Sequence, residues 1–358
     1  MARCIRPALQ VAALGVFLSL TGCASLGSAR LQHDQVDYAL ALTSAQKRQT
    51  LINIVGLRFG ESPSVLPVTQ VIAAYEFDGS ASASFSATDA DGALGSAALG
   101  IGAGYGNHPT FTFTPVTGEE YAGSYIRPLA PSLVLPLMQS GVPIDVLLRI
   151  AVQSAGPLRN TAALAGDDSA GDAGFFELIH ALRRLQLNGA LVLRVEAGDV
   201  QRVFLSIDPE RAADVEVTRD AADVRRLLRL PEDLREVEIV YGAVARAAGQ
   251  IAIVTRSVTG ILTELGAQVE VPEREVASGA TTPTVGTLGV ESKPTIVIRC
   301  GAAAPADAYV SVQRQGTAYW IERTDFDSKF AFSVLQSLIA LAQSDRASPA
   351  PVVTIPAG

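Results

Sequence analysis

The chain has little of the side-chain chemistry that most enzymes use. Its 358 residues include only three histidines, His33, His108 and His180. None of them has a cysteine or a carboxylate at metal-ligand spacing, so we expect no metal site and no cofactor. No serine lies in a G-x-S-x-G elbow, and no phosphate-binding G-x-x-x-x-G-K-[S/T] loop occurs.

A glycine-rich stretch does not supply the missing nucleotide motif. Glycine occupies the alternate positions Gly100, Gly102, Gly104 and Gly106. The spacing G-x-G-x-x-G would require glycine where Tyr105 stands, so the stretch favours a strand with one bare face.

Lysine is scarce too, and the charge balance is acidic. The 36 acidic residues outnumber the 28 basic ones, of which three are lysines, and the net charge is −8. An acidic surface disfavours nucleic acid and electrostatic adhesion to anionic lipid. We therefore expect no nucleic-acid partner.

What the chain does have is a secretory signal. Arg3 and Arg6 precede the apolar run Val11–Leu20, which is short for a bilayer, since a spanning helix needs about 20 apolar residues. Two small residues and a cysteine then complete the stretch Leu20-Thr21-Gly22-Cys23. This pattern predicts a signal peptide over residues 1–22.

The stretch ending at Cys23 resembles the lipobox of bacterial lipoproteins. The resemblance implies cleavage between Gly22 and Cys23 and acylation of Cys23. Because Ala24 rather than aspartate follows, it also implies the outer membrane, on the periplasmic side. Two or three acyl chains would anchor the protein firmly. The alternative is an ordinary secretory signal in which Cys23 is incidental.

Cleavage would change the charge and the cysteine count. Residues 1–22 contain two basic residues and no acidic one, so the mature chain would hold 26 basic and 36 acidic residues, a net charge of −10. Cys4 would leave with the signal and Cys23 would carry lipid. Cys300 would then be alone, which excludes an intramolecular disulfide. We interpret it as structural rather than as a nucleophile.

We predict an α+β fold with a mixed or antiparallel sheet, packed helices and a long N-terminal β-hairpin. The expected divisions are the signal peptide 1–22, a lipidated tether 23–36, a helix plus long β-hairpin 37–128 and an α+β body 129–358. In the second of these segments, Thr43 and Gln46 suggest a capping box at the start of an amphipathic helix over 44–59, and Gly60 ends it.

The hairpin is predicted from a period of two. Apolar residues take nearly every odd position over 71–88 and again over 99–113, and Asp89–Gly92 supplies turn residues. Paired residues share a face, so their numbers must sum to an even value. The chain therefore needs a three- or five-residue loop, or a bulge near Gly95–Ala98.

Periodicity predicts the remaining elements. Helices are expected at 131–139, 143–153, 175–187, 221–230, 258–265 and 328–342, the last of them central and buried, and strands at 190–195, 200–207, 237–241, 251–255, 295–299, 309–313 and 318–322. Loops are expected at 161–174 and 277–292.

The densest group of ionisable residues is Asp325, Asp327 and Lys329. Either aspartate could accept hydrogen bonds from the first turn of the helix that follows, and we interpret the group as a cap. A metal or acid–base role is the alternative, and it would make the protein a periplasmic hydrolase.

Four stretches resemble uncharacterised proteobacterial lipoproteins, which implies the class but no activity. They are Arg58–Pro63, Pro109–Tyr121, Ser140–Arg149 and Trp320–Lys329. We expect a non-catalytic envelope assembly or scaffold component that acts through protein contacts with envelope proteins still to be identified.

A second hypothesis concerns the hairpin. Its apolar face carries Tyr75, Phe77, Tyr105, Phe111 and Phe113, which pack onto helices in the simplest interpretation. The pattern also resembles lipoprotein subunits of export channels that each donate hairpins to a shared pore. That resemblance implies an oligomeric pore subunit that inserts residues 71–114 into the outer membrane.

We predict that Cys23→Ala abolishes labelling with palmitate and releases the protein from membranes, because the thiol that accepts the lipid would be missing from position 23. Metabolic labelling and membrane fractionation measure both effects, with Cys300→Ala as the matched control. Continued labelling of Cys23→Ala would exclude the lipobox.

Overall fold

The computed structural model describes residues 23–65, 68–72, 75–85, 97–107, 110–113, 116–162, 170–198, 201–208, 214–232, 234–284 and 294–344. The predicted signal peptide and the predicted turn Asp89–Gly92 lie outside the described residues, as does much of the loops expected at 161–174 and 277–292. Within the described part, no helix has both the length and the apolarity needed to cross a membrane.

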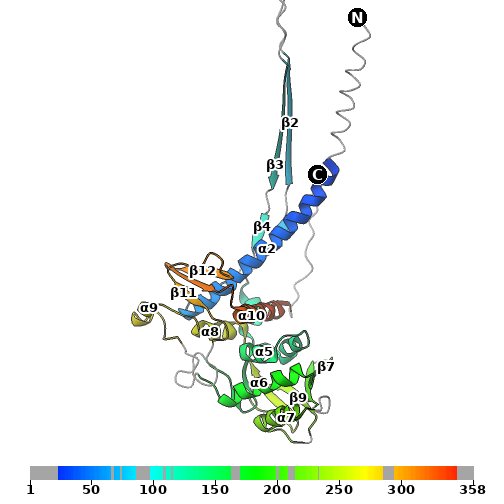
Figure 1. Cartoon of the computed structure of the whole chain (residues 1–358), viewed down its shortest axis with the longest axis vertical. Helices are drawn as coiled ribbons and strands as arrows, with labels where there is room; N and C mark the ends of the chain where they lie inside the picture. The colour runs from blue at the N-terminus through cyan, green and yellow to red at the C-terminus, as the bar shows by residue number, and fades with distance from the viewer. Residues whose placement is uncertain are drawn as a thin grey trace, which may run out of the picture. The chain divides into compact units, whose positions relative to one another are not determined.

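The chain is α+β, as predicted, and forms two compact units, which we describe separately (Figure 1). One unit comprises residues 1–64 and 117–358, and the other comprises 65–116. The two units meet at 64/65 and 116/117, whereas the sequence suggested a division at 128/129. Residues 37–64 belong with the body, because Leu51, Ile54 and Val55 are fully buried in that unit.

The first described helix, α2, spans Cys23–Arg58. It includes the stretch 23–36 expected as a tether and begins 21 residues before the predicted helix start. Thr43 does not cap it, because its Oγ1 donates to the carbonyl oxygen of Ala39 at 2.8 Å. A threonine hydroxyl that bonds back to residue i−4 sits within a continuing helix.

The end of α2 is as predicted. Gly60 has a φ of +75°, in the left-handed region that glycine adopts without strain. The N–H of Glu61 then donates to the carbonyl oxygen of Gly56 at 2.9 Å, which closes the last turn.

The body contains a mixed six-stranded sheet in which only β9 and β10 pair in parallel. The four of its strands that were predicted, β7 to β10, are confirmed within one or two residues, and β5 and β6 were not predicted. The order is β6-β5-β10-β9-β8-β7, with bounds β5 Val152–Ala155, β6 Leu158–Arg159, β7 Leu191–Glu196, β8 Arg202–Ile207, β9 Glu236–Tyr241 and β10 Gln250–Thr255.

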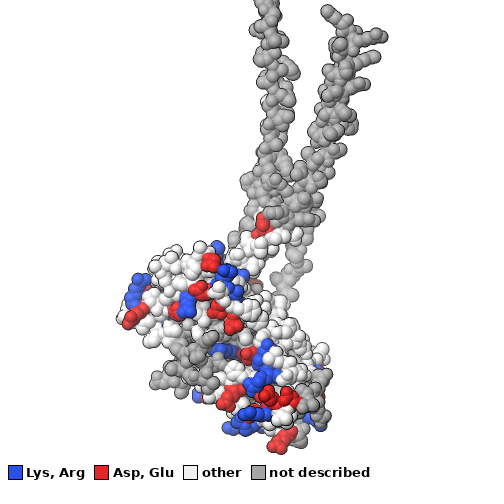
Figure 2. Space-filling view, viewed as in Figure 1, with Lys and Arg blue, Asp and Glu red and all other residues white. Residues whose placement is uncertain are grey.

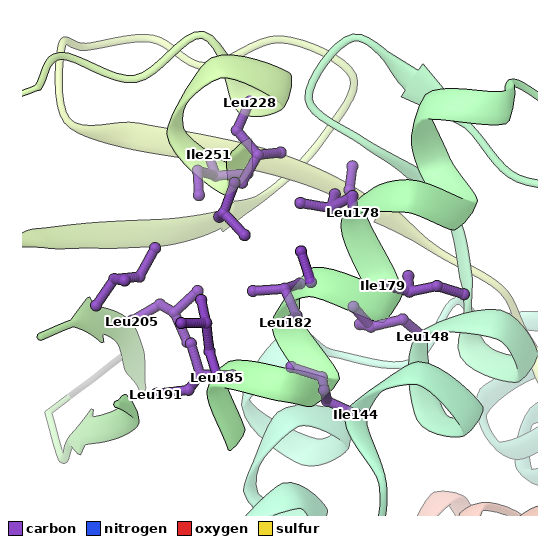
Figure 3. Packing of buried hydrophobic residues seen from close by; sticks show 14 of the residues in the cluster. Ile144, Leu148, Leu178, Ile179, Leu182, Leu185, Leu191, Leu205, Leu228 and Ile251 are labelled. Carbon is purple, nitrogen blue, oxygen red and sulfur yellow. The ribbon is translucent and has the colours of Figure 1, made fainter. Parts of the chain in front are cut away.

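The main core packs helices against this sheet (Figure 3). The helices are α5 Ile144–Ala151, α6 Ala173–Leu187 and α7 Val215–Leu228. Leu182 and Leu185 of α6 and Leu205 of β8 are among the buried residues. α7 begins earlier than predicted because Asp214 caps it, its Oδ1 accepting from the N–H of Glu216 at 2.9 Å.

Short irregular helices lead into this region. They are α3 Gly118–Tyr121, the π-helix η1 Ala122–Ile126, α4 Pro131–Val134 and the 3-10 helix η2 Leu135–Met138. The last two occupy the predicted helix 131–139. The next predicted helix, 143–153, ends early at Ala151, and β5 follows directly.

A second sheet of three antiparallel strands lies in the same unit, with order β11-β13-β12. Its strands are β11 Arg299–Gly301, β12 Val310–Arg314 and β13 Thr317–Ile321, and its helices are α8 Val258–Ala267, α9 Glu273–Ala277 and α10 Phe326–Ser344. α10 buries one face, which includes Phe332, Leu335 and Leu338, while Ser333 and Ser337 are exposed. α9 was not predicted.

The strand predicted at 295–299 is largely wrong. Ile296 and Ile298 are buried, but this segment is bound by two side chains and by the N–H of Glu270 rather than by a neighbouring strand. The N–H of Thr295 donates to Gln268 Oε1 at 2.8 Å, and the N–H of Val297 donates to Ser328 Oγ at 2.9 Å. Regular pairing starts only at Arg299.

The second unit consists of β1 Val68–Ile72, β2 Tyr75–Phe85, β3 Ala97–Asn107 and β4 Thr110–Phe113. β1 pairs with β4 and β2 with β3, both antiparallel. The β2–β3 ladder runs without a break from Tyr75↔Asn107 to Phe85↔Ala97, and its partner numbers keep one even sum, as the alternation requires. The connection between the two strands, 86–96, lies outside the described residues.

We predict that Gly266→Ala destabilises the body. A Cβ at Gly266 would lie 3.0 Å from the carbonyl oxygen of Ile54 and 3.4 Å from the N of Arg58, where α8 crosses α2. Overpacking of this kind costs about 1–3 kcal/mol, more than alanine gains in helix propensity. Urea unfolding measures the loss. Ser333→Ala, at an exposed position of α10, should be nearly neutral, and equal stabilities of the two variants would contradict the close crossing.

Candidate functional site

The structure places the predicted polar group at a helix start. Asp325 caps α10, because its Oδ1 accepts from the N–H of Ser328 at 3.0 Å and its Oδ2 from Ser328 Oγ at 2.6 Å. Asp327 is exposed, and Lys329 Nζ lies 6.0 Å from the ring centroid of Phe326. The capping interpretation is therefore confirmed for Asp325, and the observation that motivated a hydrolase is accounted for.

The other predicted residues lie apart from one another. Cys23 is the first residue of α2, and Gly22 lies outside the described residues. Cys300 lies in β11, where burial, and then Glu270, raise the pKa of its thiol. A thiol that stays protonated is a poor nucleophile. His180 is exposed on α6, and no group of metal ligands forms in the described ranges.

The structure instead draws attention to Arg256, between β10 and α8, which is only 7% exposed. Its Nη1 donates to the carbonyl oxygens of Arg149 and Ile150 at 3.0 and 3.1 Å. Its Nη2 donates to the carbonyl oxygen of Thr161 and lies 3.7 Å from Glu264 Oε2. Burial lowers the pKa of this guanidinium, and the carboxylate of Glu264 opposes that shift.

These contacts explain why α5 ends where it does. The last carbonyls of a helix have no partner inside the helix and need one elsewhere. Asn160 Nδ2 donates to the carbonyl oxygens of Arg149 and Val152 at 2.9 and 2.7 Å. The N–H of Arg256 donates to the carbonyl oxygen of Ala151 at 2.7 Å. The chain can therefore leave the helix for β5 without burying an unpaired carbonyl.

The same junction fixes the segment around Leu129. The N–H of Leu129 donates to the carbonyl oxygen of Arg256 at 3.1 Å, and Thr255 Oγ1 donates to the carbonyl oxygen of Leu129. Residues 127–132 are thereby held across the ends of the central strands.

This arrangement creates a cleft beside the carboxyl ends of β9 and β10. It consists of two adjoining cavities that share Pro128 and Tyr241, and we call it the Tyr241 cleft. The first, of about 510 Å³, lies between residues 127–132 and strands β8 and β9. The second, of about 460 Å³, lies between the end of β10, the start of α8 and Thr161. Both volumes are in the range of ligand sites.

Ion pairs hold the charged side chains of the cleft. Arg202 Nε donates to Glu238 Oε1 at 2.7 Å, and Gln250 Nε2 donates to Glu238 Oε2 at 2.9 Å. The hydrogen bond from Arg202, followed by that from Gln250, holds the pKa of the Glu238 carboxyl below its usual value. Arg256 and Glu264 form the corresponding pair in the second cavity.

The charged pairs continue over the adjoining sheet surface. Arg194 bonds both carboxylate oxygens of Glu236 at 3.0 and 2.8 Å, and it also bonds Glu196. The guanidinium groups of Arg194 and Arg202 lie 4.3 and 4.9 Å from the ring centroid of Phe204. Figure 2 shows acidic and basic side chains interspersed on the visible face, despite the net charge.

Sequence reasoning missed both Arg256 and Tyr241. It predicted β9, which ends at Tyr241, and β10, which ends just before Arg256, but not that the two strands lie side by side in parallel. The local signal that exists is Ser257, whose Oγ accepts from the N–H of Gly260 at 3.0 Å and so marks the start of α8.

Comparison with known proteins gives no relatives: no family model, no curated protein and no solved structure matches the chain.

We predict that Arg256→Met strongly destabilises the body, by about 3–5 kcal/mol, because it leaves Glu264 and three carbonyls without their buried cation. The double variant Arg256→Met/Glu264→Leu should recover part of the loss, since it removes the uncompensated charge. Urea unfolding provides the comparison. Arg323→Met, which breaks an exposed pair with Asp307, is the control and should cost no more than about 1 kcal/mol. Equal losses for the two arginines would contradict the central role of Arg256.

Proposed function

We propose that this protein is a lipoprotein of a bacterial outer membrane, anchored through acyl chains on Cys23 and facing the periplasm. It acts through protein contacts, as an assembly or scaffold component of the envelope, and not as a catalyst. The lipobox-like stretch in the sequence supports lipid attachment at Cys23, and the length of α2 supports the role as a scaffold component.

The observation that carries the proposal is the continuity of α2. The described part of the helix runs without interruption from Cys23 to Arg58. At 1.5 Å per residue, its 36 residues extend over about 54 Å. Its last turns lie in the core, where Leu51, Ile54 and Val55 are fully buried. Such a helix would hold the body at a fixed distance from an anchor at Cys23, whereas the sequence predicted only a short tether there.

The middle of α2 also offers a contact surface. Val36 and Leu40, one helical turn apart on the same side, are 58% and 62% exposed. Side chains of this kind between an anchor and a folded body suit contact with another envelope protein. The paired charges of the sheet surface would instead contribute specificity, because exposed ion pairs add little free energy.

The pore hypothesis keeps one specific observation in its favour. β2 and β3 each contain 11 residues and pair along their whole length. A tilted strand needs about 9–11 residues to cross a bilayer. In that function the partners would be further copies of this chain.

Site-specific photo-crosslinking in intact cells tests the proposal and separates the two functions. A photoreactive residue at Val36 or Leu40 should give an adduct of defined mass with a different envelope protein. The same residue at Val215, which is 82% exposed on α7, is the control and should give none.

Two results would count against the scaffold function. Adducts containing only this chain, together with light scattering that shows an oligomer after detergent extraction, would favour the pore subunit. Equal, non-specific labelling from all three positions would remove the contact surface on α2. A monomer in detergent would eliminate the pore subunit.

A further inference from the structure

The Tyr241 cleft has neutral polar side chains that no other described residue binds. Thr259 Oγ1 is buried and has no hydrogen-bond partner in the described part of the chain. The side-chain amides of Gln153 and Gln201 and the hydroxyl of Tyr241 also form no side-chain hydrogen bond among the described residues. Buried polar atoms are almost always paired, so an orphan such as Thr259 Oγ1 calls for an explanation.

Four of the five charged residues that line the cleft are, by contrast, already compensated. Arg202 is bonded to Glu238, and Arg256 is bonded to three carbonyls and lies against Glu264. Arg127, an exposed residue of the first cavity, is the one lining charge without an ion pair among the described residues. A strongly charged ligand would therefore find little to oppose its own charge. The lining favours a neutral ligand rich in hydroxyl or amide groups.

Tyr241 stands where the two cavities meet. It lines both of them and is 54% exposed, so its ring is available to a ligand that extends from one cavity into the other. An aromatic ring offers an apolar surface and a polar hydroxyl together. A pyranose sugar has the matching chemistry, with a face of C–H groups and a rim of hydroxyls.

A peptide fits this cleft less well. The strands that line it, β5, β8, β9 and β10, each have a neighbouring strand on both sides, so no open strand edge is available for a peptide to extend the sheet. The cleft also has a single aromatic side chain, whereas grooves for proline-rich peptides are lined by several.

We propose that the Tyr241 cleft binds a neutral saccharide chain, with one sugar unit in each cavity and the ring of Tyr241 stacked between them. The amides of Gln153 and Gln201 hydrogen-bond the sugar hydroxyls, and Thr259 Oγ1 does so after a rotation of its side chain into the second cavity. This binding is independent of the contact surface on α2, so the body would hold a glycan while the helix contacts a protein.

Titration of the detergent-solubilised full chain with chitotetraose and cellotetraose tests the proposal, read by isothermal calorimetry and saturation-transfer NMR. Wild type should bind at least one of these neutral sugars, and tetragalacturonate, of equal length but anionic, much more weakly. Tyr241→Ala should weaken binding about tenfold, which corresponds to about 1.4 kcal/mol. Val244→Ala, 78% exposed and outside the cleft, is the matched control and should bind as wild type does.

Thr259→Val separates a binding role from a structural one. It keeps the shape of the side chain and removes the unpaired hydroxyl, so stability should be unchanged or higher while saccharide binding weakens several-fold. No binding by wild type at millimolar concentration would overturn the proposal. So would tighter binding of tetragalacturonate, or equal binding by Tyr241→Ala and Val244→Ala.

Discussion

The contact between the Arg256 guanidinium and the carbonyl end of α5 is the constraint on which the body depends. A buried cation is costly unless it is paired, and a helix end is costly unless its carbonyls are bonded. Here each satisfies the other, with Glu264 as the counter-charge. Because the same backbone unit also bonds Leu129, one residue fixes both walls of the Tyr241 cleft. The cleft is thus a consequence of how α5 ends and α8 begins.

A second arginine has a related role at the end of α2. Arg58 is 6% exposed, its Nη2 donates to the carbonyl oxygen of Thr282 at 2.7 Å, and its own carbonyl accepts from Thr281 Oγ1 at 2.7 Å. These bonds tie the segment after α9 to the last turn of α2, and the close approach at Gly266 ties α8 to the same turn. A force applied to α2 would therefore reach both the segment after α9 and the helix α8, which lines the cleft.

The sequence predicted an element correctly when the residues that determine that element are neighbours in the chain. Alternation predicted the even sum of paired residues in β2 and β3, because a slip of one residue would exchange the two faces, but it left the particular register open. α6 followed from its apolar stripe. The start of α2 did not, since Thr43 resembles a cap in sequence but bonds back within the helix. The segment before β11 was misassigned because its partners, Gln268 and Ser328, are distant side chains. Arg256 and Tyr241 meet at one cleft only through the parallel pairing of β9 and β10, which no local pattern encodes.

The distribution of charge in the body bears on what it can recognise. Arg194, Arg202 and Arg256 each bind an acidic side chain of the same chain, so much of the charge near the cleft is compensated within the protein. Paired charges fix geometry, and they leave recognition to the groups that remain unpaired, which here are hydroxyls, amides and one aromatic ring. An acidic protein can in this way present a neutral binding surface. In the proposed function, the long helix α2 sets the distance between an anchor at Cys23 and that surface, because its rise per residue is fixed by its own hydrogen bonds.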